Sequence, residues 1–152
     1  MKKDKLFVYG SLMGGIQSPI ANYLKSNSTF LGEGTVKGLL LDIGHYPGLV
    51  YKPQSEKNVI GHVFELNDAI AMLPNLDHYE CVGPNFETPN QYRRAEVKVL
   101  LKEQTIACWA YLYNLPIEGI KIIESGNYLA YFEENEAYQK FVASLNNFDR
   151  PV

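Results

Sequence analysis

The sequence predicts an α+β fold in which helices flank a curved or barrel-like β-sheet. Segments with strand patterns dominate the chain, and helical patterns lie between and after them. Glycines recur inside the long extended segment 30–41, and repeated glycine in a strand indicates the bends or bulges of a strongly curved sheet. Because 152 residues is an ordinary length for one core, we expect residues 1–152 to form a single domain.

The first elements are marked by residues with clear local chemistry. Residues 6–9 form a short apolar run that stops at Gly10, which predicts a buried strand entering a turn. Ser18 can cap a helix, and Pro19 suits the first helical position because its missing N–H would have no partner there. The sequence therefore predicts a strand, a glycine-containing turn, a helix and then the extended segment 30–41.

The middle of the chain is expected to continue with a loop over 43–48, a strand over 49–51, a turn over 52–58 and a strand over 59–66. Asn67 and Asp68 predict the start of a short helix over 69–73. We expect Pro74 to interrupt or restart that helix, because proline lacks the interior N–H donor, and a further helical turn to cover 76–80.

The last third predicts a loop over 81–90, then a hairpin of strands 92–101 and 105–115. Apolar residues at helical spacing from Ala137 to Leu145 predict a final amphipathic helix.

Composition narrows the classes of partner. A formal net charge of −3 gives no reason to expect nucleic acid or an anionic membrane. Cys81 and Cys108 are far apart and predict free thiols, and the three histidines share no metal-ligand spacing, so we expect no metal and no cofactor. No secretion signal or membrane-spanning segment is apparent, so a cytoplasmic location is expected.

The turn after the first strand has the context of an anion-binding turn, because it follows a strand and precedes a helix. It lacks the lysine of a phosphate-binding P-loop, and Ser11 lacks the surroundings of a serine nucleophile. What remains is a set of backbone N–H groups that can hold a carboxylate or a developing oxyanion.

Two carboxylates, Asp77 and Glu80, stand among apolar and aromatic residues just before the 81–90 loop. Burial raises a carboxyl pKa, and a raised pKa suits a glutamate that must take up and return a proton near neutral pH. On local sequence alone the plainer interpretation is stronger: Asp77 ties the turn and Glu80 is a solvated surface residue.

Taken together, six short motifs in order, from about residue 6 to residue 131, resemble the gamma-glutamylcyclotransferase-like family, specifically its gamma-glutamylamine cyclotransferase type. They are Phe7-Val8-Tyr9-Gly10-Ser11-Leu12, Tyr46-Pro47-Gly48-Leu49-Val50 with Ile60-Gly61-His62-Val63-Phe64, Leu76-Asp77-His78-Tyr79-Glu80, Tyr92-Arg93-Arg94, Trp109-Ala110-Tyr111-Leu112-Tyr113 and Ser125-Gly126-Asn127-Tyr128. The resemblance implies a small mixed β-sheet curled into a partial barrel with flanking helices.

The resemblance also implies an activity, the release of 5-oxoproline and a free amine from a small-molecule gamma-glutamyl substrate. It assigns Glu80 as general acid and base, and substrate binding to Tyr9, Gly10, Ser11, Leu12 and Tyr111. Weaker candidates for substrate contact are Tyr92, Arg93, Arg94 and Tyr46, and Arg94 has the alternative of pairing with a structural carboxylate. We expect a monomer or weak homodimer.

Two departures from the family pattern leave an alternative open. Asn127 stands where many relatives carry aspartate, and the 81–90 loop beside Glu80 is longer than in several relatives. A changed loop there is expected to alter the leaving amine that is accepted or to close the pocket. The alternative function is a non-catalytic small-molecule-binding domain of the same fold.

Overall fold

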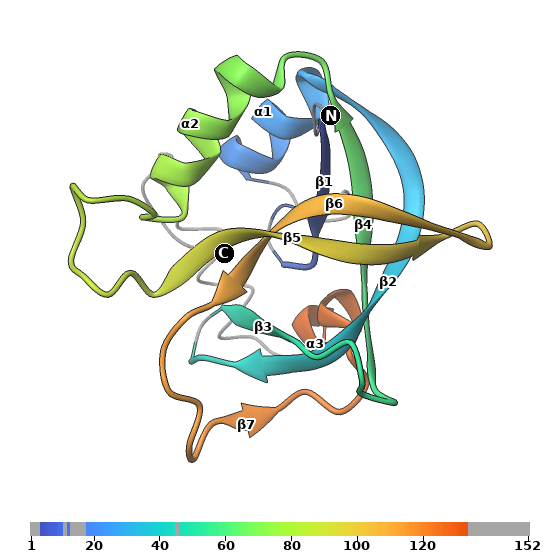
Figure 1. Ribbon diagram of the computed structural model, residues 1–152, viewed down its shortest axis with the longest axis vertical. Coiled ribbons are helices and arrows are strands. Elements are labelled where there is room, and N and C mark those ends of the chain that lie inside the picture. Colours follow the sequence, from blue (N-terminus) through green and yellow to red (C-terminus); the bar gives the residue numbers. More distant parts are fainter. Residues whose placement is uncertain (1–3, 11, 13–17, 45, 134–152) are drawn as a thin grey trace.

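The computed structural model describes residues 4–10, 12, 18–44 and 46–133 (Figure 1). Within this part of the chain, five strands pair around a closed barrel in the order β2–β4–β1–β6–β5. These strands are β1 (Lys5–Val8), β2 (Ser28–Asp42), β4 (Asn58–Leu66), β5 (Tyr92–Leu101) and β6 (Gln104–Tyr113). A single pairing of β2 with β5, at Thr35 and Leu100, closes the ring.

The sheet is mixed, as the resemblance implies. β1 runs parallel to β6, with Leu6 opposite Trp109, whereas its pairing with β4 is antiparallel. The predicted hairpin is present, since β5 and β6 pair antiparallel over their full length. The prediction of a curled mixed sheet with helices around it is therefore confirmed.

The far end of β2 carries two short additional strands, β3 (Pro47–Tyr51) and β7 (Lys121–Ile122). The described helices are α1 (Pro19–Ser26), α2 (Ala69–Tyr79) and α3 (Tyr128–Glu133). Figure 1 shows α1 and α2 together at one end of the barrel, and Asn75 of α2 donates a hydrogen bond to the Tyr23 hydroxyl of α1 at 2.9 Å. The α3 helix contacts the end of β2, where the Tyr131 hydroxyl donates a hydrogen bond to Asp42 Oδ2.

Local chemistry explains two of these elements. The Ser18 side chain accepts a hydrogen bond from Ala21 N at 3.2 Å, so α1 begins with the predicted cap and with proline at its first position. In β2 the register shifts between Phe30 and Gly32, where Gly32 has a φ of +141° that other residues rarely adopt. The predicted glycine bend in this strand is confirmed.

The core of the described chain is built from apolar residues and from several tyrosines of the barrel and its helices. Five tyrosines are among the largest fully buried side chains: Tyr9, Tyr79, Tyr92, Tyr111 and Tyr128. Gly61 lets β1 approach closely, since a Cβ atom there would lie 2.4 Å from the Val8 carbonyl oxygen. A buried tyrosine needs a hydrogen-bond partner for its hydroxyl, and these partners determine much of the site described below.

Several boundaries differ from the predictions. The α2 helix runs through Pro74 without interruption. Pro74 and its partner position Ile70 both face solvent, and Ile70 is 75% exposed, so water can reach the Ile70 carbonyl that loses its helical donor. The buried residues on the opposite side, including Met72 and Leu76, hold the helix together across the proline.

The β6 strand ends at Tyr113 rather than at residue 115, and Asn114 N donates to Gln91 O at 2.8 Å just beyond its end. β3 begins at Pro47, two residues earlier than expected, and β7 and α3 were not predicted from the sequence. The predicted helix over 137–145 lies outside the described residues. In the described part of the chain, no helix has the length and apolarity needed to cross a membrane.

Candidate functional site

Glu80 is the residue at which α2 ends. Cys81 N donates to His78 O at 3.1 Å, and Val82 N donates to Asp77 O at 2.9 Å, which together form a Schellman cap. The cap places Cys81 in the left-handed region, with a φ of +58°. Glu80 is the C-cap residue of α2, and the chain turns sharply at Cys81. The backbone of the helix end therefore fixes the direction in which the Glu80 side chain leaves the helix.

The Glu80 carboxyl points into the protein and has no solvent exposure. It lines a small pocket together with Phe7, Val8, Tyr9, Gly10, Leu12 and Tyr111. The structure thus brings together five of the predicted site residues, whereas Ser11 lies outside the described residues. The interpretation of Glu80 as a solvated surface residue is wrong, because β1 and β6 cover the end of α2.

The pocket is narrow. Its volume of about 10 Å³ is close to the space that one water molecule requires. Ligand pockets in proteins usually measure about 300–1,000 Å³. In this conformation the pocket can therefore hold a single small group beside Glu80 rather than a whole substrate.

The tyrosine hydroxyls around the pocket are engaged with the protein itself. Tyr9 donates to Tyr111 O at 2.6 Å and accepts from Leu49 N at 3.2 Å, so one hydroxyl links the turn after β1 to β6 and β3. Burial raises the pKa of Tyr9 well above its usual value, and the nearby Glu80 charge raises it further. Tyr9 consequently remains a neutral hydrogen-bond donor that holds the pocket wall in place.

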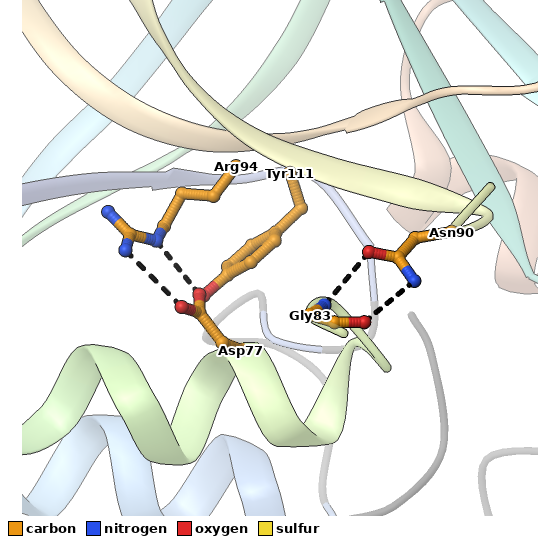
Figure 2. A network of polar contacts seen from close by, with 5 residues as sticks. All are labelled: Asp77, Gly83, Asn90, Arg94 and Tyr111. Carbon is orange, nitrogen blue, oxygen red and sulfur yellow. Dashed lines mark hydrogen bonds and ion pairs between the residues drawn. The ribbon is translucent and has the colours of Figure 1, made fainter. Parts of the chain in front are cut away.

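Asp77, one helical turn before Glu80, is held by two residues of the β5–β6 hairpin (Figure 2). Arg94 Nε lies 2.8 Å from Asp77 Oδ1 and Arg94 Nη2 lies 3.2 Å from Oδ2, while the Tyr111 hydroxyl donates to Oδ1 at 2.6 Å. The Arg94 guanidinium also lies over the Trp109 ring, 4.5 Å from its centroid. Arg94 therefore pairs with a structural carboxylate, the alternative that the sequence left open.

The other weaker candidates do not line the Glu80 pocket as it is described. The Tyr92 hydroxyl donates to Pro47 O at 2.6 Å, and the Tyr46 hydroxyl donates to Gln91 Oε1 at 3.0 Å. Arg93 is exposed on β5. The rings of Tyr92 and Tyr46 pack against each other, with their centroids 6.3 Å apart. Burial raises the Tyr92 pKa, and Tyr92 lies close enough to Glu80 for the Glu80 charge to help raise it further.

The 81–90 loop is closed by one side chain, Asn90 (Figure 2). Asn90 accepts from Gly83 N at 2.8 Å and donates to Gly83 O at 3.1 Å and to Glu87 O at 3.0 Å. A shallow depression of about 470 Å³ runs along this loop and includes Cys81, the residue after Glu80. The loop is thus an ordered wall beside the end of α2.

The side chain of Asn127 has a structural role at the start of α3. Its side-chain oxygen accepts a hydrogen bond from Ala130 N at 3.3 Å and so caps the start of α3. An aspartate can make the same contact, because its carboxylate is an equally good acceptor at a helix N-terminus. The departure from the family pattern therefore leaves this contact intact.

The sequence does not indicate one wall of the pocket or the residue that closes the loop. It assigns Phe7 only to a buried strand and Asn90 only to a loop, whereas Val8 belongs to the turn that it does predict for the site. The close approach of Phe7 to Gly61, where a Cβ atom would lie 2.5 Å from the Phe7 ring, is a tertiary contact that the sequence does not indicate. Among the described residues, no group of three or more histidine, cysteine, aspartate or glutamate side chains is arranged to hold a metal ion.

Comparison with known proteins gives consistent matches. The sequence profile of the family described as "Gamma-glutamyl cyclotransferase, AIG2-like" matches residues 6–130. A protein of Citrobacter rodentium, named "Gamma-glutamylcyclotransferase family protein ytfP", is 32% identical over 126 residues, which cover 82% of this chain and 95% of that protein.

Solved structures of similar proteins agree. An AIG2-like protein from Mus musculus superposes with a TM-score of 0.63 at 25% identity, covering 82% of this chain and 88% of that one. The solution structure of YtfP from Escherichia coli superposes with a TM-score of 0.57 at 29% identity, covering 82% of this chain and 96% of that one.

Proposed function

The chain belongs to the gamma-glutamyl cyclotransferase, AIG2-like family, and from this premise we propose that it is a cyclotransferase with Glu80 as its general acid and base. The substrates are gamma-glutamyl amines or gamma-glutamyl amino acids. The products are 5-oxoproline and a free amine.

The reaction is an intramolecular displacement. The α-amine of the substrate attacks its own γ-carbonyl carbon, a C–N bond forms to close a five-membered ring, and the original amide C–N bond breaks. Because both reacting groups belong to one molecule, ring closure needs little additional ordering. Glu80 takes a proton from the α-ammonium group and returns it to the departing nitrogen. The new ring nitrogen loses a second proton, which the free amine takes up as it becomes an ammonium ion, so protons balance over the cycle.

The observation that carries the proposal is the burial of Glu80 in a pocket that it shares with Tyr9, Gly10, Leu12 and Tyr111. A fully buried carboxyl at the end of a pocket is a frequent arrangement for proton transfer. The N–H groups of the Gly10–Leu12 turn are the proposed donors to the oxyanion that develops on the γ-carbonyl. Tyr9 and Tyr111 act as pocket walls, since both hydroxyls already have protein partners.

The size of the pocket adds a requirement. A volume of about 10 Å³ cannot hold a gamma-glutamyl group, so substrate binding must be accompanied by opening of the pocket. The free energy of that opening reduces the apparent affinity in proportion to the population of the open form.

The test is release of 5-oxoproline from a panel of gamma-glutamyl amines and amino acids, with the parent protein and Glu80→Gln. Glutamine keeps the shape of the side chain but cannot accept the ammonium proton. We expect turnover to fall by about 10²–10⁴-fold while substrate still binds. Ser11→Ala is the comparison variant and should lose less, because the proposed contribution of Ser11 is its backbone N–H.

Two results would contradict the proposal. Near-parental turnover by Glu80→Gln would show that the base is another group. Binding of gamma-glutamyl compounds by a parent protein that turns none of them over would favour a non-catalytic binding domain.

A further inference from the structure

A second cavity lies on the outside of the barrel, beside the pairing of Thr35 on β2 with Leu100 on β5. Figure 1 shows β5 crossing β2. Its volume of about 680 Å³ is within the range of small-molecule pockets, about 300–1,000 Å³. The described residues that line it and those that line the Glu80 pocket have no member in common. We call it the lysine groove, after Lys37, Lys57 and Lys98 in its lining.

The three lysines come from different parts of the chain. Lys37 is on β2, Lys57 directly precedes β4 and Lys98 is on β5. Lys57 pairs with Glu124, also in the groove, at 2.8 Å. Within the described part of the chain, Lys37 and Lys98 form no ion pair. A protein with a formal net charge of −3 thus gathers two uncompensated ammonium groups in one groove.

The groove also offers an aromatic and apolar surface. Tyr51 accepts a hydrogen bond from Lys98 N at 3.1 Å, which holds its ring against β5. Leu100, on the same strand, is 51% exposed although it is a large apolar residue. Exposed apolar area beside charged donors is typical of a site that binds a ligand with an organic part and an ionic part.

The walls of the groove are held by backbone hydrogen bonds. Lys52 N donates to Lys37 O at 3.0 Å, and Gly38 N donates to Lys57 O at 3.0 Å. Ile60 N donates to Gly126 O at 2.7 Å, which secures the side near Glu124. A preformed groove of this kind loses little conformational entropy when a ligand binds.

From these observations we propose that the lysine groove binds a small organic phosphate. A phosphate monoester carries a charge of about −1.5 to −2 at neutral pH, which matches the two uncompensated lysines. Lysine is a common point-charge partner of phosphate. The organic part of the ligand lies on Tyr51 and Leu100. This site is independent of the Glu80 pocket and of the activity proposed there.

The experiment measures binding to the full chain by calorimetry at low ionic strength, with adenosine monophosphate, inorganic pyrophosphate and uncharged adenosine as probes. We expect both phosphates to bind and adenosine to bind much more weakly. Lys98→Gln and Lys37→Gln should each reduce the affinity for adenosine monophosphate by at least about fivefold. Lys102→Gln, the matched control, removes the same charge from the exposed tip of the same hairpin and should change binding by less than about twofold.

Leu100→Ala separates the two parts of the site. This variant should bind adenosine monophosphate more weakly but bind pyrophosphate with unchanged affinity. Because Leu100 is exposed, the variant protein should still fold. The proposal is overturned if neither phosphate binds. It is likewise overturned if Lys102→Gln weakens binding as much as Lys98→Gln does, because binding would then be a non-specific electrostatic attraction to the protein surface. It is also overturned if Glu80→Gln abolishes phosphate binding, or if a single-stranded oligonucleotide binds far more tightly than the mononucleotide.

Discussion

The Asp77 carboxylate and the Arg94 guanidinium form a two-pronged contact, with one N–O distance of 2.8 Å and another of 3.2 Å. The contact joins the last turn of α2 to β5, and Glu80 follows Asp77 by three residues. Their side chains are only about a quarter exposed, at 24% for Arg94 and 23% for Asp77. The pair therefore positions the helix end that carries the proposed base.

Asp77→Asn should destabilise the protein. Asparagine still accepts the Tyr111 hydroxyl, but the Arg94 charge is left in a partly buried place without its counter-charge. Because the pair is partly solvated, we expect a loss of about 1–3 kcal/mol in the free energy of unfolding, measured by urea denaturation.

The matched control for Asp77→Asn is Glu124→Gln. It removes a carboxylate from the Lys57–Glu124 pair, whose N–O distance is also 2.8 Å but whose side chains are 51% and 72% exposed. An exposed pair of this kind contributes about 0–1 kcal/mol. Equal losses for the two variants would contradict the positioning role of Asp77.

Tyr92 predicts a specific dependence of stability on pH. Burial raises the Tyr92 pKa well above its ordinary value, whereas a tyrosine in the unfolded chain ionises near pH 10. The contribution of the buried, neutral Tyr92 to the free energy of unfolding is complete below about pH 10. It decreases at higher pH, because unfolding then releases the proton of the tyrosine hydroxyl. This decrease is about 1.4 kcal/mol per pH unit for each such tyrosine.

Tyr92→Phe tests this dependence. At neutral pH the variant should be less stable by about 1–3 kcal/mol, because the Pro47 carbonyl loses its donor. Above about pH 10 the difference should narrow, since phenylalanine cannot ionise. Denaturation curves at several pH values check this, and a difference that stays constant with pH would refute it.

The two thiols should differ in reactivity. Cys108 has no solvent exposure and burial raises its pKa to about 12, whereas Cys81 is partly exposed. Because the thiolate is the reactive form, alkylation of the native protein should modify Cys81 and leave Cys108 unmodified until the protein unfolds. Peptide mass spectrometry identifies the modified residue. Equal rates at both sites would contradict the burial of Cys108.

Asn90→Ala should loosen the 81–90 loop without unfolding the barrel. The substitution removes three hydrogen bonds, two of them to Gly83. We expect amide exchange at Gly83 to accelerate by at least about tenfold, with a small change in thermal stability. Asn85→Ala, at an exposed position in the same loop, is the control. Unchanged exchange at Gly83 in Asn90→Ala would show that Asn90 does not hold the loop.

Elements whose cause is local were accessible from the sequence. The start of α1 depends on Ser18, Pro19 and a backbone group three residues away. The bend in β2 depends on a φ that Gly32 adopts easily. Such features are encoded within a few residues, so the residue types alone indicate them. At Pro74 the converse holds: the local preference of proline predicts an interruption, but tertiary packing of the buried face of α2 outweighs it.

The sequence by itself determined that a mixed strand-rich fold carries a glycine turn and a candidate carboxylate at Glu80. It could not decide whether Glu80 is solvated or buried, because both alternatives share the same local residues. That decision depends on contacts far along the chain: Tyr9 of the first turn bonds to Tyr111, 102 residues later, and Asp77 is held by Arg94, 17 residues later. Burial is decided by which distant segments pack together, and only the tertiary structure brings β1 and β6 over the end of α2.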